Sequence, residues 1–354
     1  MAHNTIIGGI QQIGIGNPDT YKLWEWYRRA FYVDIPIFDE AATAELMLPY
    51  TGGNPQKRHA VLAMSMQGGG GLEIWQYTER IPAPIKFKAA LGDLGIFIVK
   101  IKSKDVHQTY QHLQSIGAQL ITEPLKDPIN SDHFYCIDPY QNIVEVVHSD
   151  EWYTHTKATT GGVYGCTIGV SDMDKSLKFY QEILGYDKII YDISGVQDDY
   201  KQLSGGDERY RRVLVGHSSE RRGPFSQWIG SSHLELVQSL SRAPKKLFED
   251  RYWGDIGYIH LCYDIQGIAA MKERCTEAGH AFTVDSSDSF DMGEAAGHFS
   301  YIEDPDGTLI EFVEAHKIPI LKKLGWYLDL RKRNPSKPLP KWMLKALSLN
   351  RKKD

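Results

Sequence analysis

The chain has 354 residues, of which 42% are hydrophobic and 24% charged, and its formal net charge is -5. This composition excludes a disordered or fibrous protein, and the length predicts two domains of about 150 residues each. No stretch reaches the roughly 18 apolar residues of a membrane span, and the first residues lack the apolar core of a signal peptide, so we expect a cytoplasmic protein. Scattered cysteines without C-x-x-C spacing predict free thiols at Cys136, Cys166, Cys262 and Cys275.

In chain order, the sequence repeats one pattern four times. Each copy begins with a short strand, a polar N-cap and an amphipathic helix, and ends with a strand that carries a Glu among apolar residues. The opening strand and helix occupy residues 10–31, 94–118, 165–186 and 259–280. The closing strands occupy residues 71–77, 141–148, 232–238 and 308–314. Such a repeat predicts four copies of one structural unit.

The boundaries of these elements follow from residue type and spacing. Leu177, Tyr180 and Leu184 fall on one helical face, at intervals of three and four residues. Glycine stands where three of the helices should end, at Gly117, Gly185 and Gly279. The sequences DPYQ at 138–141 and DPDG at 304–307 predict turns before two closing strands, and the glycine run at 68–71 predicts another turn.

These elements predict an α+β fold of four β-α-β-β-β modules, which form two domains with curved mixed sheets. One module is too small to bury both faces of its sheet, so modules must pair. We expect domain 1 at residues 1–150 with modules one and two, a polar linker at 151–161, and domain 2 at 162–316 with modules three and four.

The last segment, residues 317–354, differs in charge from the rest of the chain. It carries twelve Lys/Arg against two Asp, with Trp and Leu residues between the bases and prolines at 335, 338 and 340. This pattern predicts a basic tail with short amphipathic helices. Either the tail docks on an anionic membrane surface or an acidic partner, or it packs on its own acidic body.

The strings GCTIGVSDMDKSLKFYQEILG and FSYIEDPDGTLIEF resemble the opening strand-helix and the closing strand of a vicinal oxygen chelate module. That superfamily contains glyoxalase I, methylmalonyl-CoA epimerase, extradiol dioxygenases and drug-binding resistance proteins. The resemblance covers roughly residues 7–316. It implies the scaffold strongly but the reaction only weakly, because these families share a fold and catalyse unrelated reactions.

The resemblance implies a metal held by one side chain on the first strand and one carboxylate on the last strand of each module. The first-strand positions are Gln12, Gly95, Gly165 and His260. The last-strand positions are Glu73, Glu145, Glu235 and Glu311. Glycine has no side chain to bind a metal, so modules one and four are complete and modules two and three are not. For module one, Gln11 is an alternative to Gln12 one residue away.

Two pairings of the modules remain open. Pairing one with two and three with four gives each site three candidate ligands: Gln12, Glu73 and Glu145, or Glu235, His260 and Glu311. Crossed pairing, one with four and two with three, puts Gln12, Glu73, His260 and Glu311 together and leaves Glu145 and Glu235 in a dead site. We favour crossed pairing, because this set resembles the ligands of glyoxalase I and both losses then fall in one site.

The resemblance to glyoxalase I implies proton abstraction next to a carbonyl, with Glu311 as the base and Glu73 as the second carboxylate. Mixed nitrogen and oxygen ligands suit Zn, Ni, Co, Mn or Fe. A metal-free binder of the drug-resistance type is one alternative. A ring-cleaving extradiol dioxygenase is another, although the resemblance would place one of its histidines at Gly165.

Alternation along the strands suggests further residues for a small-molecule pocket. Trp75 and Tyr77 share a face with Glu73, and His233 shares one with Glu235. His298 lies on the strand before a closing strand. Arg209, Arg211 and Arg212 could bind an anion, but a solvated strand edge is the favoured interpretation. We expect a monomer or homodimer that binds no nucleic acid and no nucleotide cofactor.

Overall fold

In the computed structural model, residues 5–287, 290–292, 295–321 and 326–352 are described. The first module contains β1 (Ile6–Gly16), α1 (Thr20–Phe31), β2 (Ile35–Ala44), β3 (Gln56–Met64) and β4 (Gly71–Tyr77). The second contains β5 (Gly95–Ser103), α2 (Val106–Ser115), β6 (Gln119–Leu120), β7 (Leu125–Lys126), β8 (Asp132–Ile137) and β9 (Ile143–His148).

The third and fourth modules repeat this order of elements. The third contains β10 (Thr160–Gly169), α3 (Met173–Leu184), β11 (Lys188–Gly195), β12 (Tyr210–Gly216), α4 (Ser226–Ile229) and β13 (His233–Ser239). The fourth contains β14 (Gly257–Gln266), α5 (Ile268–Glu277), β15 (Val284–Asp285), β16 (Phe290–Met292), β17 (Ala295–Glu303) and β18 (Leu309–Ala315). The predicted α+β fold of four modules is confirmed.

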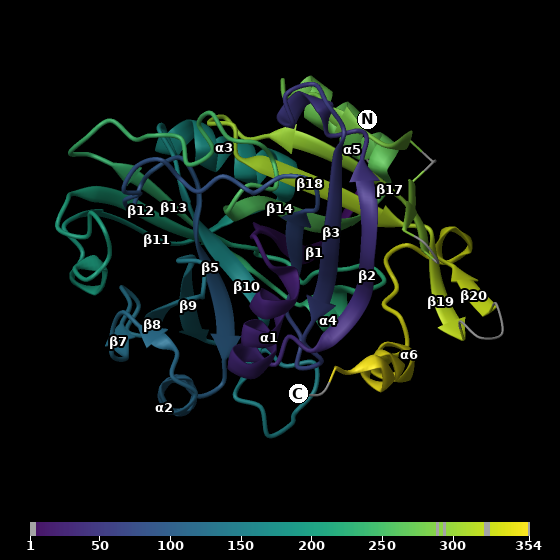
Figure 1. Cartoon of the computed structure of the whole chain (residues 1–354), viewed down its shortest axis with the longest axis horizontal. Coiled ribbons are helices and arrows are strands. Elements are labelled where there is room, and N and C mark those ends of the chain that lie inside the picture. Colours follow the sequence, from purple (N-terminus) through teal and green to yellow (C-terminus); the bar gives the residue numbers. More distant parts are fainter. Residues whose placement is uncertain (1–4, 288–289, 293–294, 322–325, 353–354) are drawn as a thin grey trace.

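The strands form two large sheets, and each sheet combines one module from each half of the chain (Figure 1). The first sheet has the order β15-β17-β18-β14-β1-β4-β3-β2, from modules four and one, and the second has β11-β12-β13-β10-β5-β9-β8-β6, from modules three and two. The opening strands β1 and β14 pair antiparallel at the centre of the first sheet. The structure therefore has the crossed pairing. Each sheet contains strands from both sides of the linker at 151–161 in the sequence. The division into domains at that linker stays a prediction.

Consecutive modules meet through their helices instead. The Tyr27 hydroxyl on α1 donates a hydrogen bond to Asp138 in the turn between β8 and β9, at 3.2 Å. The equivalent Tyr180 on α3 donates to Asp304 in the turn between β17 and β18, at 2.9 Å. These aspartates begin the two predicted turns. Each helix thus ties its own module to the next one, while the sheet ties it to the module across.

Local sequence explains where the helices begin and end. The side chains of Asp19, Asp105 and Asp172 each accept a hydrogen bond from the backbone N–H three residues later, which caps α1, α2 and α3. Gly185, at φ 74°, ends α3 in the left-handed region as predicted. Apolar residues of α1, α2, α3 and α5 and of both sheets form one buried cluster.

The glycine run at 68–71 makes the predicted turn and also joins the two sheets. Gly70 and Val163 of β10 exchange backbone hydrogen bonds at 2.8 Å in both directions. Gly69, at φ 100°, lies so close to Gly162 that a Cβ would be 2.8 Å from its carbonyl carbon. Only glycine permits both this conformation and this approach.

Two segments from the second half of the chain lie against the first sheet. One contains α4, within module three, and the other is the connection from module three to module four. The segment containing α4 packs on β1, where a Cβ on Gly9 would lie 2.7 Å from Ile229, and Trp228 donates from Nε1 to the carbonyl of Ser65 at 2.9 Å. The connection between β13 and β14 carries Trp253, which is buried among aromatic residues of the first sheet. The α4 segment and the connection between β13 and β14 therefore pack on the sheet of modules one and four.

The C-terminal extension continues from β18 as β19 (Lys317–Leu321), β20 (Trp326–Asp329), the single turn η5 (Leu330–Lys332), α6 (Lys341–Ala346) and η6 (Leu347–Asn350). Residues 322–325 and 353–354 of the predicted tail lie outside the described residues. Leu330, Leu339 and Leu344 are buried against the main body. Short helices are present, as the sequence predicted.

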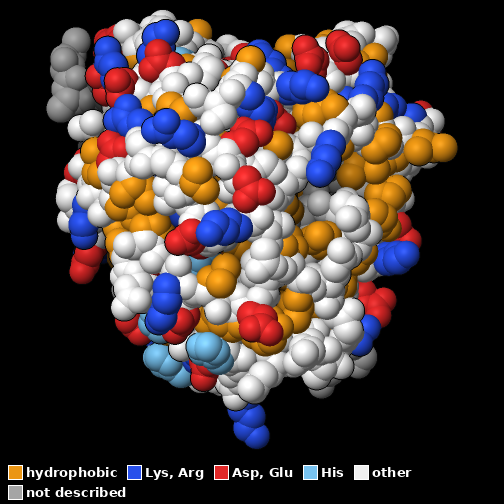
Figure 2. Space-filling model, turned by 90° about the vertical axis from the view of Figure 1, so that its left-hand side faces the viewer, with side chains coloured by type: hydrophobic (Ala, Val, Ile, Leu, Met, Phe, Trp, Pro, Cys, Tyr) orange, Lys and Arg blue, Asp and Glu red, His pale blue; other side chains and the backbone are white. Residues whose placement is uncertain are grey.

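Two other expectations from the sequence concern thiols and membrane spans. All four cysteines are free and buried. No helix among the described residues is long and apolar enough to cross a membrane. On the face seen in Figure 2, Lys and Arg side chains alternate with Asp and Glu, and hydrophobic side chains are scattered between them.

Candidate metal centre

Four neighbouring strands in the middle of the first sheet carry the predicted ligands. Gln12 lies on β1, Glu73 on β4, His260 on β14 and Glu311 on β18. Ligand atoms of Glu73, His260 and Glu311 all lie within 4.8 Å of one another, and these three residues are called the Glu-His-Glu cluster below. The register is the same in both modules, since β1 pairs Gly14 with Glu73 and β14 pairs Cys262 with Glu311.

The imidazole lies between the two carboxylates. His260 Nε2 is 3.3 Å from Glu73 Oε2 and 3.2 Å from Glu311 Oε2. Gln12 Nε2 donates a hydrogen bond to Glu73 Oε2 and another to Glu311 Oε2, both at 3.5 Å. All four side chains are buried. Two first strands and two last strands thus bring nitrogen and oxygen donors to one point.

A bulge in β1 decides between Gln11 and Gln12. The pairing with β14 shifts between Ile10 and Gln12, and Gln12 then lies opposite Cys262. Gln11 instead accepts a hydrogen bond from the Cys262 thiol, at 3.6 Å. Gly14 leaves space for the His260 ring, because a Cβ there would lie 2.4 Å from the ring. Gln12 is therefore the amide that donates to both carboxylates, and its role as a metal ligand stays a prediction.

The charges of the cluster depend on one another. Burial lowers the pKa of His260, but the charges and hydrogen bonds of Glu311 and Glu73 outweigh burial and raise it to about 9. Burial raises the pKa of Glu73, but the interaction with His260 outweighs this effect and lowers it. In the metal-free protein, a protonated imidazole balances part of the charge of the two carboxylates.

The residues fit a divalent cation. Gln12 Oε1 is buried and has no hydrogen-bond partner among the described residues. Buried polar atoms in proteins nearly always have a partner, so this oxygen is available to a cation at this point. Two carboxylates, one imidazole and one amide oxygen are ligands that borderline divalent metals accept.

Aromatic side chains cover the cluster. The Trp253 ring stacks on His260 with centroids 6.1 Å apart and 12° between the planes, and it meets Trp75 edge-on at 4.6 Å. The Tyr301 hydroxyl is 3.5 Å from His260 Nδ1. Sequence reasoning missed Trp253 and Tyr301, since Trp253 lies in a connection without periodicity. Tyr301 had a signal: it stands on the strand before β18, opposite Glu311.

A pocket of about 430 Å³ opens next to these rings. Trp253 belongs to its lining, together with Ile259, which precedes His260, and Leu309, two residues before Glu311. Two residues along a strand span about 7 Å. The pocket and the Glu-His-Glu cluster are therefore neighbours on the same strands, with aromatic side chains between them.

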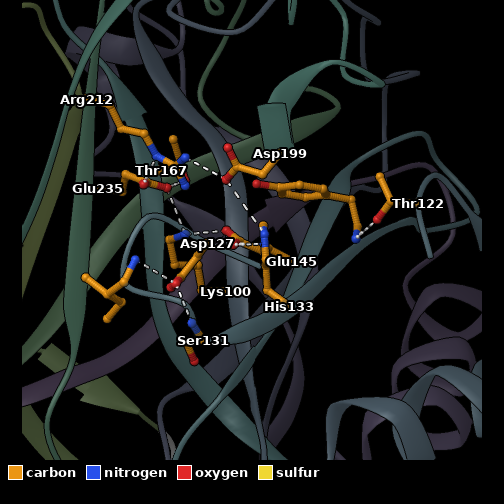
Figure 3. A network of polar contacts seen from close by, with 12 residues as sticks. Lys100, Thr122, Asp127, Ser131, His133, Glu145, Thr167, Asp199, Arg212 and Glu235 are labelled. Atoms are coloured by element: carbon orange, nitrogen blue, oxygen red, sulfur yellow. Dashed lines mark hydrogen bonds and ion pairs between the residues drawn. The ribbon is translucent and has the colours of Figure 1, made fainter. Parts of the chain in front are cut away.

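The equivalent carboxylates of the second sheet face cations supplied by the protein itself (Figure 3). The Lys100 ammonium on β5 donates to Glu145 and, at 2.9 Å, to Glu235. The Arg212 guanidinium on β12 donates to Glu235 and, at 2.6 Å, to Asp199. All five residues are buried and are called the Lys-Arg network below.

Electrostatics favour the charged forms in this network. Burial lowers the pKa of Lys100, but the charges of Glu145 and Glu235 outweigh it and raise the pKa. Burial raises the pKa of Glu235, whereas Arg212 and Lys100 together lower it far more. His133 adds a contact of 2.8 Å to Glu145. An ammonium and a guanidinium thus occupy the position where a metal would have to bind.

The structure corrects two details of the sequence interpretation. Glu145 pairs with Lys100, so by the register of the other modules the first-strand position of module two is Ile98, and the alignment on Gly95 was wrong. Neither residue can bind a metal. At Gly165 a Cβ would lie 1.7 Å from the carbonyl oxygen of His233, so that position accepts no side chain. The prediction that Arg212 lies on a solvated strand edge is also wrong, because its side chain is buried.

The predicted pocket residues divide into two groups. Trp75 and Tyr77 lie beside Glu73 on β4, and the Tyr77 hydroxyl donates to the carbonyl of Trp253. His233 lies on β13 of the second sheet, where burial lowers its pKa to about 4. His298 pairs with Asp285 at 2.6 Å and stands opposite Glu314, on the other face of the sheet from Glu311. The substrate roles of all four stay predictions; Trp75 and Tyr77 are buried beside the cluster and do not belong to the lining of the 430 Å³ pocket.

Comparisons with known proteins agree with this fold. Residues 163–312 match the model of the Glyoxalase/Bleomycin resistance protein/Dioxygenase superfamily. A probable lactoylglutathione lyase from Vibrio parahaemolyticus is 20% identical over 156 residues, which cover 44% of this chain and 92% of that protein.

Two solved structures match nearly the whole chain. Glyoxalase I from Zea mays is 14% identical, with 97% of this chain and 96% of that chain covered and a TM-score of 0.55. A putative dioxygenase from Bacillus subtilis is 11% identical, with 87% and 86% covered and a TM-score of 0.54. At these identities the likeness shows the fold alone.

The Lys-Arg network predicts a large loss of stability when one cation is removed. Lys100→Met leaves two buried carboxylates with less compensation, so we expect the free energy of unfolding to fall by about 3–5 kcal/mol. The matched control is Lys57→Met, because Lys57 and Glu79 form an exposed pair and should contribute less than about 1 kcal/mol. Urea titrations measure both, and equal small losses would contradict this account of the network.

The raised pKa of His260 predicts how the stability of the metal-free protein depends on pH. The imidazole binds its proton more tightly in the folded state, at a pKa of about 9, than in the unfolded chain, at about 6.5. This contribution is fully present below about pH 6.5 and is lost as the pH rises through about 9, at most roughly 3 kcal/mol. Urea titrations in chelator compare wild type with His260→Gln. Parallel curves from pH 6 to 10 would contradict the assignment.

Proposed function

Since residues 163–312 belong to the Glyoxalase/Bleomycin resistance protein/Dioxygenase superfamily, we propose that this chain is a divalent-metal-dependent enzyme that abstracts a proton next to a carbonyl group. Gln12, Glu73, His260 and Glu311 would hold the metal. The reaction would be a lyase, isomerase or epimerase step on a small organic substrate. Zn, Ni, Co, Mn and Fe all suit these ligands.

One observation carries this proposal. Both sheets bury two glutamates at equivalent positions, but only the Glu-His-Glu cluster lacks a lysine or arginine among the described residues in contact with it. Two buried carboxylates without such a partner are costly. His260 supplies one positive charge at most, whereas a divalent ion would balance both carboxylates and give the unpartnered Gln12 Oε1 a partner.

The bound metal would act as a Lewis acid that stabilises the enolate oxygen formed when the proton leaves. Glu311 is our candidate for the base, and Glu73 for the permanent second carboxylate. The Tyr301 strand and the stacked Trp253 limit water around Glu311, which favours proton transfer to a carboxylate. Trp75 and Tyr77 would contact the substrate from the β4 side.

The ligand types argue against the two alternatives. A ring-cleaving dioxygenase uses two histidines and one carboxylate, whereas the cluster has one imidazole and two carboxylates. A metal-free binder would have no need of two carboxylates, an imidazole and an amide brought together from four neighbouring strands. The metal-dependent lyase or isomerase is therefore the function that we favour.

Metal content tests the ligand assignment. We expect about one transition metal per chain in reconstituted wild type, and loss of that metal in His260→Ala and Glu73→Ala, because each removes a ligand. Glu145→Ala is the matched control, since Glu145 holds the equivalent position in the second sheet. Elemental mass spectrometry on the folded fraction measures the content. Metal that survives His260→Ala, or disappears in Glu145→Ala alone, would overturn the assignment.

Turnover tests the role of Glu311. Glu311→Gln keeps an oxygen ligand but removes the base, so we expect metal to bind at raised concentration while kcat falls by about 10²–10⁴. Glu73→Gln is the matched control and should affect metal affinity more than kcat. Lactoylglutathione is the first compound to assay, given the probable lactoylglutathione lyase relative. A larger loss of kcat in Glu73→Gln would assign the base to Glu73 instead.

A further inference from the structure

The exposed side of the C-terminal segment carries lysines together with two large apolar side chains. Along α6 and η6, the outward side chains are Lys341, Trp342, Lys345 and Leu349. Trp342, Lys345 and Leu349 recur at intervals of three and four residues, so they lie near one face of the helical turns, and Lys341 is next to Trp342. Trp342 is 63% exposed and Leu349 is 87% exposed, which is unusual for side chains of this size.

The opposite side of the same segment attaches it to the body. Leu344 is buried, and Met343 and Leu347 pack on the same apolar cluster. Arg351 forms an ion pair with Asp34, whose carbonyl also accepts from the Lys352 N–H at 2.9 Å. Neither Trp342 nor Leu349 is needed for this attachment. Their exposure therefore leaves them free to contact something else.

Positive charge surrounds these two apolar side chains. Lys332, Lys337, Lys345 and Lys352 are exposed and have no ion-pair partner among the described residues. A neighbouring groove of about 450 Å³ between α1, α2 and the end of the chain is lined by Arg28, Arg29, Arg351 and Lys352. Asp34 is the acidic residue of that lining, and Arg351 already pairs with it.

This distribution of charge differs from that on the face seen in Figure 2. Where Figure 2 shows the body, basic and acidic side chains alternate, whereas the segment from residue 330 to 352 has no Asp or Glu at all. Figure 1 shows α6 at the lower edge of the molecule, and Arg351 and Lys352, which follow η6, line one groove with Arg28 and Arg29 of α1. Bases, one indole and one leucine thus lie together at one edge.

We propose that this edge docks the protein on an anionic phospholipid membrane. The indole and the leucine are separated by lysines, so they form no continuous apolar patch of the kind that a protein partner covers. Tryptophan and leucine amid lysines instead match the interfacial region of a bilayer, where rings lie at headgroup level and lysines bind lipid phosphates. The proposal is independent of the reaction that the chain catalyses.

Co-sedimentation of the full chain with vesicles tests the electrostatic part. We expect binding to vesicles with about one third phosphatidylserine, little binding to pure phosphatidylcholine, and weaker binding as salt rises. Lys341→Glu with Lys345→Glu should weaken binding at least about tenfold. The matched control, Lys175→Glu with Lys178→Glu on α3, changes charge equally at another exposed helix and should leave binding intact.

Single substitutions test the apolar part. Trp342→Ser and Leu349→Ser should each weaken vesicle binding about three- to tenfold without change in thermal stability. Ile81→Ser is the matched control, because Ile81 is as exposed as Leu349, at 87%, and lies outside the C-terminal segment. Absence of binding to anionic vesicles would overturn the proposal, and so would equal losses in the C-terminal variants and their controls.

Discussion

The structure depends on how four buried carboxylates are balanced. Each sheet carries two glutamates at its centre, on the last strands of two modules, with apolar strands around them. A buried carboxylate must have a cation or hydrogen-bond donors, or it loses its charge. In the second sheet, Lys100 and Arg212 supply two positive charges from the chain itself. In the first sheet, the chain supplies His260 and the Gln12 amide, and we propose that a divalent ion balances both carboxylates.

The same scaffold therefore holds its carboxylates in two ways. The register of the strands is equivalent, since Lys100, Thr167, Gly14 and Cys262 all stand opposite a glutamate. In the first sheet two of these positions are Gly and Cys, too small to fill the centre, and Gly14 allows the ring of His260 to approach. In the second sheet Lys100 fills the centre. The second site differs from the first by Lys100 and Arg212, and by Ile98 and Gly165 at the positions where the first sheet has Gln12 and His260.

Much of this could be predicted from sequence, because it depends on local pattern. Glu73 and Glu311 stand out as charges in apolar strands, and His260 occupies the matching place two residues before the partner of Glu311. The crossed pairing followed from the ligands that modules two and three lack. It did not follow from chain order, since consecutive modules also meet, through Tyr27 and Tyr180 on their helices.

Other features depend on residues far apart in the sequence and could not be read from it. The strand IFIVKIKS contains Lys100, but only the approach of β13 places Glu235 within 2.9 Å of its ammonium. The sequence predicted Arg212 as one of three surface arginines. In the structure, the segment around Asp199 buries it, and Arg212 donates to Asp199. Trp253 lies in a connection without periodicity, and its place over His260 depends on how that connection crosses the first sheet.

The most direct test of the central claim is to locate the metal by anomalous diffraction from crystals of the full chain soaked in Mn²⁺. The account predicts one strong peak about 2.0–2.3 Å from atoms of Glu73, His260 and Glu311, and none beside Lys100. No peak at the Glu-His-Glu cluster, or an equal peak in the second sheet, would contradict it.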